Sequence, residues 1–464
     1  MESTLLETSP VESAPTPRRD AFIRPTDFRL PGGQWFIGAG FGLFVHWDHA
    51  SQQGIEISWP LVGRSIIHGV DEVEDDVTVE QYQSTAATFN PTEWDAVRLA
   101  RLAKRAGATY VVFTARHHAG YAMFHTGTSD FGIEHSPFGR DITREFVEAI
   151  RAEGIRVGIY YSLSDWNHPD YPKFEMSDRP YALEHWPSAG DPAMAGTEVA
   201  DDKHRRSTPE QWARYQEYLR AQLTELLTGY GTIDLLWFDG EWERSEEEWN
   251  SAGLRAYIKS LQPDVVINDR LLGQGDYETP EQGFPVTAPS GPWELCLTIG
   301  QMWAWRPGDT KSKSTTSLVT TLVEVASRGG NLLLNIGPKG DGSLNESQVE
   351  TLDEIGGWLD RHAESVIGVS PTVGVDYYGP STAREGTLYL HLVMRPIEQV
   401  VVRGIPVGRI SGIRLLATGE QLPYEINFEV HEQTAAGEEP LGEVLIAAPA
   451  ASGSVIDVIA IDFR

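Results

Sequence analysis

The stretch Ile233-Asp234-Leu235-Leu236-Trp237-Phe238-Asp239-Gly240 is the part of this sequence that most constrains the fold. Its apolar residues do not alternate with polar ones, which is typical of a parallel strand buried on both faces. Asp239 comes directly after the apolar run, and Gly240 leaves the backbone free to turn. A carboxylate in this position lies at the carboxyl end of the strand, where ligands bind in barrels and open α/β sheets. Asp239 therefore either belongs to a site at that end or caps the next helix.

The same order of a short apolar run and an amphipathic helix repeats on both sides of this stretch. We interpret as strands the runs Gly42–Trp47, Tyr110–Thr114, Arg156–Ser162, Ile233–Phe238, Val265–Asn268 and Asn331–Ile336. Apolar residues in steps of three and four predict helices over Pro91–Lys104, Gln211–Leu227 and Asn345–Arg361, the last with capping-box spacing between Asn345 and Gln348. The repeated order predicts a (β/α) TIM-like barrel across residues 30–368.

Three regions depart from this order. Asn167–Ser207 follows the third strand and is long and aromatic, so we predict a loop on the substrate side. After Gly368 helical periodicity ends, and short strand-like runs predict a C-terminal β-sandwich domain over residues 369–464. These runs are Leu388–Leu392, Val400–Val402, Ile413–Leu416, Val444–Ala447 and Val455–Phe463. The polar N-terminus predicts a disordered leader over residues 1–29.

Composition narrows the class of protein. The net charge is −30, and such a surface repels nucleic acid and anionic membranes, although its main effect is solubility. No apolar stretch approaches the ~20 residues of a membrane helix, and the N-terminus lacks the features of a signal peptide. Cys296 is the single cysteine, so we expect no internal disulfide and a cytoplasmic location. A homo-oligomer is compatible with the sequence.

Polar and aromatic residues gather where the predicted strands end. They are His46-Trp47-Asp48-His49, Arg116-His117-His118, Tyr160-Tyr161-Ser162, Trp237 with Asp239, and Asp269-Arg270. One histidine beside a strand is more often structural, but five such strand ends favour a sugar pocket, in which rings stack on the pyranose and polar groups bind its hydroxyls. On a strand, adjacent His117 and His118 would point to opposite sides, so we expect no metal ion and no other cofactor.

Hydrolysis of a glycosidic bond requires two carboxylates on one site. Asp239 is the first candidate. The second must come from another loop at the same end of the sheet, and the candidates are Asp276, Glu278, Glu281 and Glu294. Their spacing alone does not choose among them.

Eight ordered blocks between about Phe36 and Gly368 resemble the α-L-fucosidases of glycoside hydrolase family 29. The blocks are Phe41–Trp47 (FGLFVHW), Phe89–Trp94 (FNPTEW), Ala106–Gly120 (AGATYVVFTARHHAG), Gly158–Tyr171 (GIYYSLSDWNHPDY), Leu235–Gly240 (LLWFDG), Asn268–Arg270 (NDR), Pro292–Thr298 (PWELCLT) and Gly330–Gly342 (GNLLLNIGPKGDG).

The resemblance implies a role for each matching residue. Asp239 matches the family's nucleophile, and Glu281, in Thr279-Pro280-Glu281, matches its acid/base. Extended geometry before Pro280 would turn Glu281 to the pocket and Glu278 away from it. Glu56, Glu278 and Glu294 are further candidate site residues. The expected fucose-contacting residues are His46, Trp59, His117, His118, Tyr160, Trp237, Arg270 and, under the sugar's methyl group, Trp303.

The chain also departs from the family pattern at several positions. Asp48 stands in place of a glycine, and Ala119 in place of an aspartate. The usual Glu-Trp pair is Ser58-Trp59, so the usual hydroxyl ligand of this loop is absent, and Glu56 two residues earlier is a candidate to replace it. The usual Trp-Gly-Tyr is Trp303-Ala304-Trp305. None of these departures involves Asp239 or Glu281.

The sequence thus predicts a retaining exo-α-L-fucosidase that releases terminal fucosyl residues from an oligosaccharide or glycoconjugate by double displacement. Two alternatives remain open. One is a retaining hydrolase of a related sugar such as an α-L-galactoside, and the other is a non-catalytic sugar-binding barrel.

Overall fold

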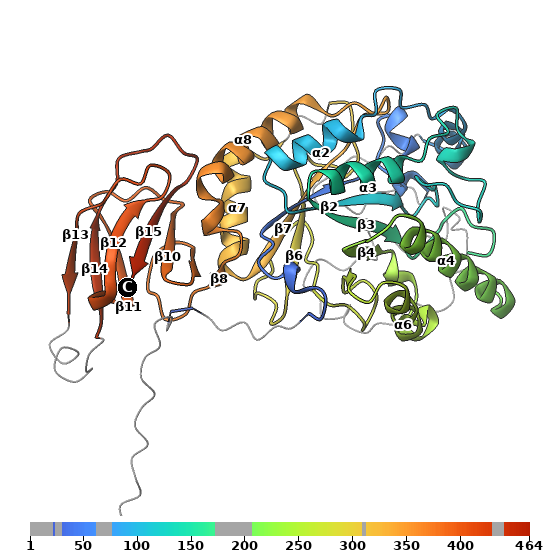
Figure 1. Ribbon diagram of the computed structural model, residues 1–464. Coiled ribbons are helices and arrows are strands. Elements are labelled where there is room, and N and C mark those ends of the chain that lie inside the picture. The colour runs from blue at the N-terminus through green and yellow to red at the C-terminus, as the bar shows by residue number, and fades with distance from the viewer. Residues whose placement is uncertain (1–21, 24–29, 62–76, 172–206, 309–311, 429–439) are drawn as a thin grey trace, which may run out of the picture.

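The computed structural model describes residues 22–23, 30–61, 77–171, 207–308, 312–428 and 440–464 (Figure 1). Its larger part is built on a seven-stranded parallel sheet with the order β5-β4-β3-β2-β1-β7-β6. The strands are β1 Phe41–Val45, β2 Tyr110–Arg116, β3 Arg156–Ser162, β4 Leu235–Asp239, β5 Val266–Ile267, β6 Trp293–Thr298 and β7 Gly330–Ile336. The predicted parallel α/β sheet is confirmed, and β6 is the strand that the sequence interpretation missed.

The sheet separates two apolar clusters. Along β4, Leu235 and Trp237 belong to an inner cluster, whereas Leu236 and Phe238 belong to an outer one that includes the surrounding helices. The inner cluster also receives Phe44 from β1 and residues from each of the other strands. Side chains from all seven strands meet in one cluster because the sheet curls around it, and this curl brings the strand ends together at one rim.

An extended segment lies between the two edge strands of this sheet. Bridges of parallel type join Tyr277 to Asn268, just after β5, and join Glu278 and Glu281 to Trp293 and Cys296 of β6. The N–H of Cys296 donates to the carbonyl of Pro280 at 3.1 Å. The segment therefore bridges the gap in the sheet and holds Glu281 beside β6.

Helices cover the outside of the sheet (Figure 1). They are α1 Val79–Ser84, α2 Ala96–Arg105, α3 Ile142–Ala152, α4 Pro209–Gly229, α5 Glu246–Trp249, α6 Ser251–Leu261, α7 Thr315–Ser327 and α8 Glu346–His362. The helix expected from Pro91 begins only at Ala96, because the side chain of Asp95 caps it. Asn345 caps α8 as predicted, but the capping box is wrong, since Gln348 instead accepts the N–H of Gly337 at 3.2 Å.

The C-terminal region is all-β, as predicted. It has a five-stranded antiparallel sheet, β12-β15-β10-β9-β8, and a three-stranded antiparallel sheet, β11-β14-β13, which share one apolar core. The strands are β8 Ser370–Pro371, β9 Ser381–Arg384, β10 Thr387–Leu392, β11 Gln399–Pro406, β12 Ile410–Leu415, β13 Tyr424–Asn427, β14 Leu441–Ala447 and β15 Asp457–Phe463. The interpretation missed β8, β9 and β13, which are short and carry few buried apolar residues.

The five-stranded sheet packs its other face on α7 and α8 (Figure 1). Tyr389 and Val458 are buried in the core of the larger part, and the indole N–H of Trp358 donates to the carbonyl of Ile456 at 2.9 Å. The predicted leader lies outside the described residues except for Phe22, which is buried in the C-terminal core, and Ile23. Most of the predicted substrate-side loop, residues 172–206, also lies outside them. Within the described ranges, none of the helices combines the length and apolar composition that spanning a membrane requires.

Candidate active site

Asp239 is the last residue of β4 and lies at the rim of the curled sheet. Gly240 follows it with φ 75°, a left-handed conformation that turns the chain away sharply. The hydroxyl of Tyr160 donates to Oδ2 of Asp239 at 2.7 Å, and the guanidinium of Arg270 donates to Oδ1 at 2.6 Å. Burial alone would raise the pKa of Asp239, but Arg270, His118 and the Tyr160 hydrogen bond outweigh burial and hold this pKa below its ordinary value. Asp239 is therefore ionised at neutral pH.

Arg270 connects Asp239 to Glu281. One terminal nitrogen of the guanidinium binds Asp239, and the other donates to Oε2 of Glu281 at 2.5 Å. Its Nε donates to the hydroxyl of Thr279 at 3.3 Å, so Thr279 and Glu281 both face Arg270, in agreement with the predicted alternation. The Glu281 side chain is 36% exposed, whereas that of Asp239 is only 11% exposed. One carboxylate is thus enclosed and the other is open to solvent, and the planar guanidinium fixes both.

The other glutamates predicted from sequence lie elsewhere. Glu278 is exposed. Glu294 is fully buried inside the sheet, where it accepts hydrogen bonds from the Tyr110 hydroxyl at 2.5 Å and the Trp237 indole N–H at 3.0 Å. Burial raises the pKa of Glu294 to about 7. Glu294 supports Trp237 from below and does not reach the rim.

Glu294→Gln is expected to weaken the pH dependence of stability. The ordinary pKa of glutamate is 4.5, so folded Glu294 holds its proton from about pH 4.5 to about pH 7 while the unfolded chain releases it. This contribution to stability is full below pH 4.5 and is lost as the pH rises through 7. The decrease in the free energy of unfolding between pH 5 and pH 8, measured with urea, should be on the order of 2 kcal/mol smaller in the variant than in the wild type. An equal decrease in the free energy of unfolding in variant and wild type would contradict the raised pKa of Glu294. Glu278→Gln, at an exposed glutamate, is the matched control.

Aromatic rings form one wall beside the carboxylates. Tyr160 lies between two rings that stack on it, Trp237 at 5.5 Å and His117 at 5.2 Å between centroids. The Arg270 guanidinium lies 4.6 Å from the centre of the Trp237 ring. The stack gives a flat, partly polar surface of the kind that binds a pyranose face.

The remaining predicted sugar contacts come from neighbouring loops. His46 Nδ1 lies 2.7 Å from Oδ1 of Asn335, and its ring packs against Trp303 at 4.8 Å between centroids. Trp59 packs edge-on against His118 at 5.9 Å. All eight residues predicted to contact the sugar therefore gather around Asp239, namely His46, Trp59, His117, His118, Tyr160, Trp237, Arg270 and Trp303.

The three histidines of this group are neutral. Burial lowers the pKa of His46 and of His118 to about 4, and it lowers that of His117 well below its ordinary value. Neutral imidazoles each offer one donor and one acceptor, which matches the hydroxyl groups of a sugar.

Glu56, the candidate from sequence for a sugar-hydroxyl ligand, is buried beneath the loop that carries Trp303. Its carboxylate accepts the backbone N–H groups of Trp303 and Ala304, both at 3.0 Å, and of Ile57 at 3.1 Å. Burial raises the pKa of Glu56 to about 7. Glu56 fixes the loop that carries Trp303 and does not point at the space beside Asp239.

The expected orientation of the paired histidines is wrong. His117 and His118 follow the end of β2 at Arg116, where strand alternation no longer applies, and their ring centroids are only 4.1 Å apart. One nitrogen of each ring and an oxygen of Asp239 lie within 4.8 Å of one another, which is a grouping that could hold a metal ion. Arg270 already places a positive charge on the same carboxylate.

Sequence reasoning missed Glu241 at this site, and it missed the contacts that Ser58 and Ser162 make with histidines. Glu241 lies two positions after Asp239, and burial raises its pKa to about 8, although Arg270 opposes this. The hydroxyls of Ser58 and Ser162 each lie 2.7 Å from Nδ1 of His117 and His118, respectively. Proximity in sequence to Asp239 could have indicated Glu241. The serine contacts join distant segments and leave no local pattern.

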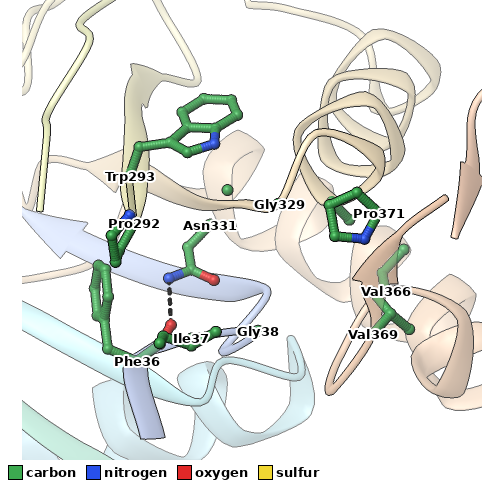
Figure 2. Close-up of a pocket in the computed structure, with 12 residues that line it drawn as sticks. Phe36, Ile37, Gly38, Pro292, Trp293, Gly329, Asn331, Val366, Val369 and Pro371 are labelled. Carbon is green, nitrogen blue, oxygen red and sulfur yellow. Dashed lines mark hydrogen bonds between the residues drawn. The ribbon is translucent and has the colours of Figure 1, made fainter. Parts of the chain in front are cut away.

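A separate pocket lies at the opposite end of the sheet (Figure 2). Trp293 and Gly330 at its edge are the first residues of β6 and β7, and the Asn331 amide donates to the carbonyl of Phe36 at 2.7 Å. The pocket also borders the C-terminal region through Val369 and Pro371. Its mostly apolar lining and its distance from the carboxylates indicate a packing gap, not a reaction site.

Two carboxylates bound to one guanidinium, beside histidines and stacked rings at the ends of parallel strands, form a site of the kind that glycoside hydrolases use. The chain belongs to the α-L-fucosidases of glycoside hydrolase family 29, whose family model, Alpha-L-fucosidase, matches residues 26–364.

Individual relatives agree with this membership. The tissue α-L-fucosidase of Bos taurus is 31% identical over 362 residues, which cover 73% of this chain and 69% of the relative. The α-L-fucosidase isoenzyme 1 of Paenibacillus thiaminolyticus has a similar structure, with a TM-score of 0.75 and 31% identity over 94% of this chain and 99% of its own. A Thermotoga maritima α-L-fucosynthase, an aspartate-to-glycine variant in complex with α-L-Fuc-(1-2)-β-L-Fuc-N3, has a TM-score of 0.71 and 26% identity over 92% of this chain and 96% of its own.

Proposed function

We propose that this chain is a retaining exo-α-L-fucosidase acting on terminal α-L-fucosyl groups of oligosaccharides or glycoconjugates. The observation that carries this proposal is the Arg270 guanidinium, which binds an enclosed, ionised Asp239 on one side and a solvent-accessible Glu281 on the other. A nucleophile must be ionised, and an acid/base must reach both the leaving oxygen and water.

In this mechanism Asp239 attacks the anomeric carbon while Glu281 protonates the departing glycosidic oxygen. The leaving alcohol departs and a fucosyl ester of Asp239 forms. Glu281 then removes a proton from water, which attacks the anomeric carbon and releases Asp239 as a carboxylate. Two inversions give net retention.

We also infer that the fold is a distorted (β/α) barrel in which Asp276–Gln282 takes the place of a regular strand. The bridges from this segment to Asn268 and Cys296 support the inference. This arrangement would place the proposed acid/base on the barrel wall itself, beside the end of β4, and the two sheets of the C-terminal region would form a β-sandwich.

The proposal predicts rapid hydrolysis of 4-nitrophenyl α-L-fucoside with release of α-L-fucose as the first product. Proton NMR of the early reaction should show the α anomer before mutarotation produces the β anomer. β-L-Fucose as the first product would exclude a retaining mechanism. Faster hydrolysis of 4-nitrophenyl α-L-galactoside would instead assign the related sugar, and binding of fucosides without any turnover would assign a sugar-binding protein.

A further inference from the structure

Three positions at which the chain departs from its family form one hydrogen-bonded unit. The hydroxyl of Ser58 lies 2.7 Å from Nδ1 of His117 and accepts the N–H of Ala119 at 2.8 Å. The N–H of Ser58 donates to the Tyr82 hydroxyl at 2.7 Å, which lies 3.5 Å from Oδ2 of Asp48. Hydrogen bonds therefore connect Asp48, Ser58 and the backbone of Ala119 behind His117.

In the described part of the Ser58 loop, residues 49–61, the only carboxylate is that of Glu56. Ser58 stands where the family usually has glutamate, and the nearby Glu56 already accepts three backbone N–H groups. Ser58 also has φ 65°, a left-handed conformation that is uncommon for a residue with a side chain. The geometry of this loop directs the Ser58 hydroxyl at His117.

The contacts of Ser58 favour one position for the proton on His117. A serine hydroxyl has one proton to donate and two lone pairs. The N–H of Ala119 uses one lone pair, and donation of the hydroxyl proton to Nδ1 of His117 is an arrangement that satisfies the buried hydroxyl. In that arrangement, the single proton of neutral, buried His117 is on Nε2.

The contacts of Ser162 give His118 the opposite form. The Ser162 hydroxyl donates to the carbonyl of Ser164 at 2.7 Å, so it can only accept from His118, whose Nδ1 lies 2.7 Å away. Neutral His118 therefore carries its proton on Nδ1 and leaves Nε2 bare. Its Nε2 lies 3.5 Å from Oδ2 of Asp239, longer than the ~2.7–2.9 Å of a charge-assisted hydrogen bond.

We propose that Ser58 and Ser162 are positioning residues that hold His117 and His118 in opposite tautomers, so that the two rings present one donor and one acceptor to the same sugar hydroxyl. The ring centroids are 4.1 Å apart, and both rings lie beside Asp239. A hydroxyl satisfies both nitrogens at once, whereas a hydrogen or a methyl group in its place satisfies neither. The identity of the ligand as a fucoside rests on the proposed function, but the tautomers do not.

Nitrogen NMR tests the tautomers without substrate. Two-bond ¹H–¹⁵N spectra of ¹⁵N-histidine protein, assigned with His117→Phe and His118→Phe, should show Nε2–H for His117 and Nδ1–H for His118. Ser58→Ala should shift His117 toward Nδ1–H and leave His118 unchanged. The same tautomer on both histidines, or no response to Ser58→Ala, would overturn the proposal even if the protein hydrolyses fucosides.

Kinetics with monodeoxy substrates tests the shared hydroxyl. Ser58→Ala should lower kcat/KM for 4-nitrophenyl α-L-fucoside about 10- to 100-fold, and Ser58→Gly, which accepts the left-handed backbone, should do the same. One of the 2-, 3- and 4-deoxy analogues lacks the recognised hydroxyl. On that analogue, Ser58→Ala should lower kcat/KM less than threefold. An equal loss on all analogues would refute the shared hydroxyl. Ser51→Ala is the matched control, since the buried Ser51 hydroxyl has no hydrogen-bond partner among the described residues.

Discussion

Asp239→Gly is expected to reduce kcat for 4-nitrophenyl α-L-fucoside by about 10⁴-fold or more, because the variant lacks the nucleophile of the first step. Azide should restore part of the rate. It fits the space left by the carboxylate and attacks the anomeric carbon once, so the product should be β-L-fucosyl azide. Mass spectrometry and proton NMR of the product check both its formation and its configuration.

The contacts of Asp239 allow its carboxylate to be removed with little change to the neighbouring residues. Its carboxylate contacts Tyr160 and Arg270, and Arg270 keeps its second partner, Glu281, when Asp239 is removed. Asp234→Asn is the matched control. Asp234 lies just before β4, at the end of the strand opposite Asp239, where it binds Arg156 at 2.9 Å, and its loss should leave kcat unchanged. Near-normal turnover by Asp239→Gly without azide would move the nucleophile to another residue.

Local sequence patterns predicted the elements whose buried residues are apolar. The limits of β3, Arg156–Ser162, are as predicted, because its run is long and ends in a turn. Strand β6 was missed because Glu294 interrupts its apolar run. That carboxyl is buried only because Tyr110 and Trp237, 184 and 57 positions away in the chain, satisfy it. The sequence pattern of a single segment does not indicate such distant partners.

At the candidate site, too, local patterns predicted some features, while contacts between distant segments determined others. The rule that ligands bind at strand ends indicated Asp239, and the extended geometry around Pro280 separated Glu281 from Glu278. The rule of strand alternation failed for His117 and His118 because β2 ends at Arg116. The role of Glu56 could not be predicted from the sequence, for a different reason. Its partners, the backbone groups of Trp303 and Ala304, come from a loop almost 250 residues further along the chain, and only the folded structure brings them together.

Glu281→Ala is expected to separate substrates by their leaving groups. General acid catalysis contributes about 10²- to 10⁴-fold, and an activated aryl leaving group needs little of it. The value of kcat/KM should therefore fall less than about tenfold for 4-nitrophenyl α-L-fucoside but about 10³-fold for a fucosyl oligosaccharide, whose alcohol leaves only when protonated. Initial rates on the two substrates provide the comparison.

The second half of the reaction gives Glu281→Ala a signature that differs from that of Asp239→Gly. Without the base, water attacks the fucosyl ester slowly, so that kcat on the aryl fucoside should fall and azide should raise it. Azide then attacks an intermediate that has already been inverted once, and the product should be α-L-fucosyl azide. Opposite anomers from the two variants would assign the nucleophile and the acid/base in one experiment. Glu281→Gln should behave like the alanine variant, and exposed Glu278→Ala should behave like the wild type. If Glu278→Ala or Glu294→Ala gave the leaving-group effect while Glu281→Ala did not, the acid/base would be that residue.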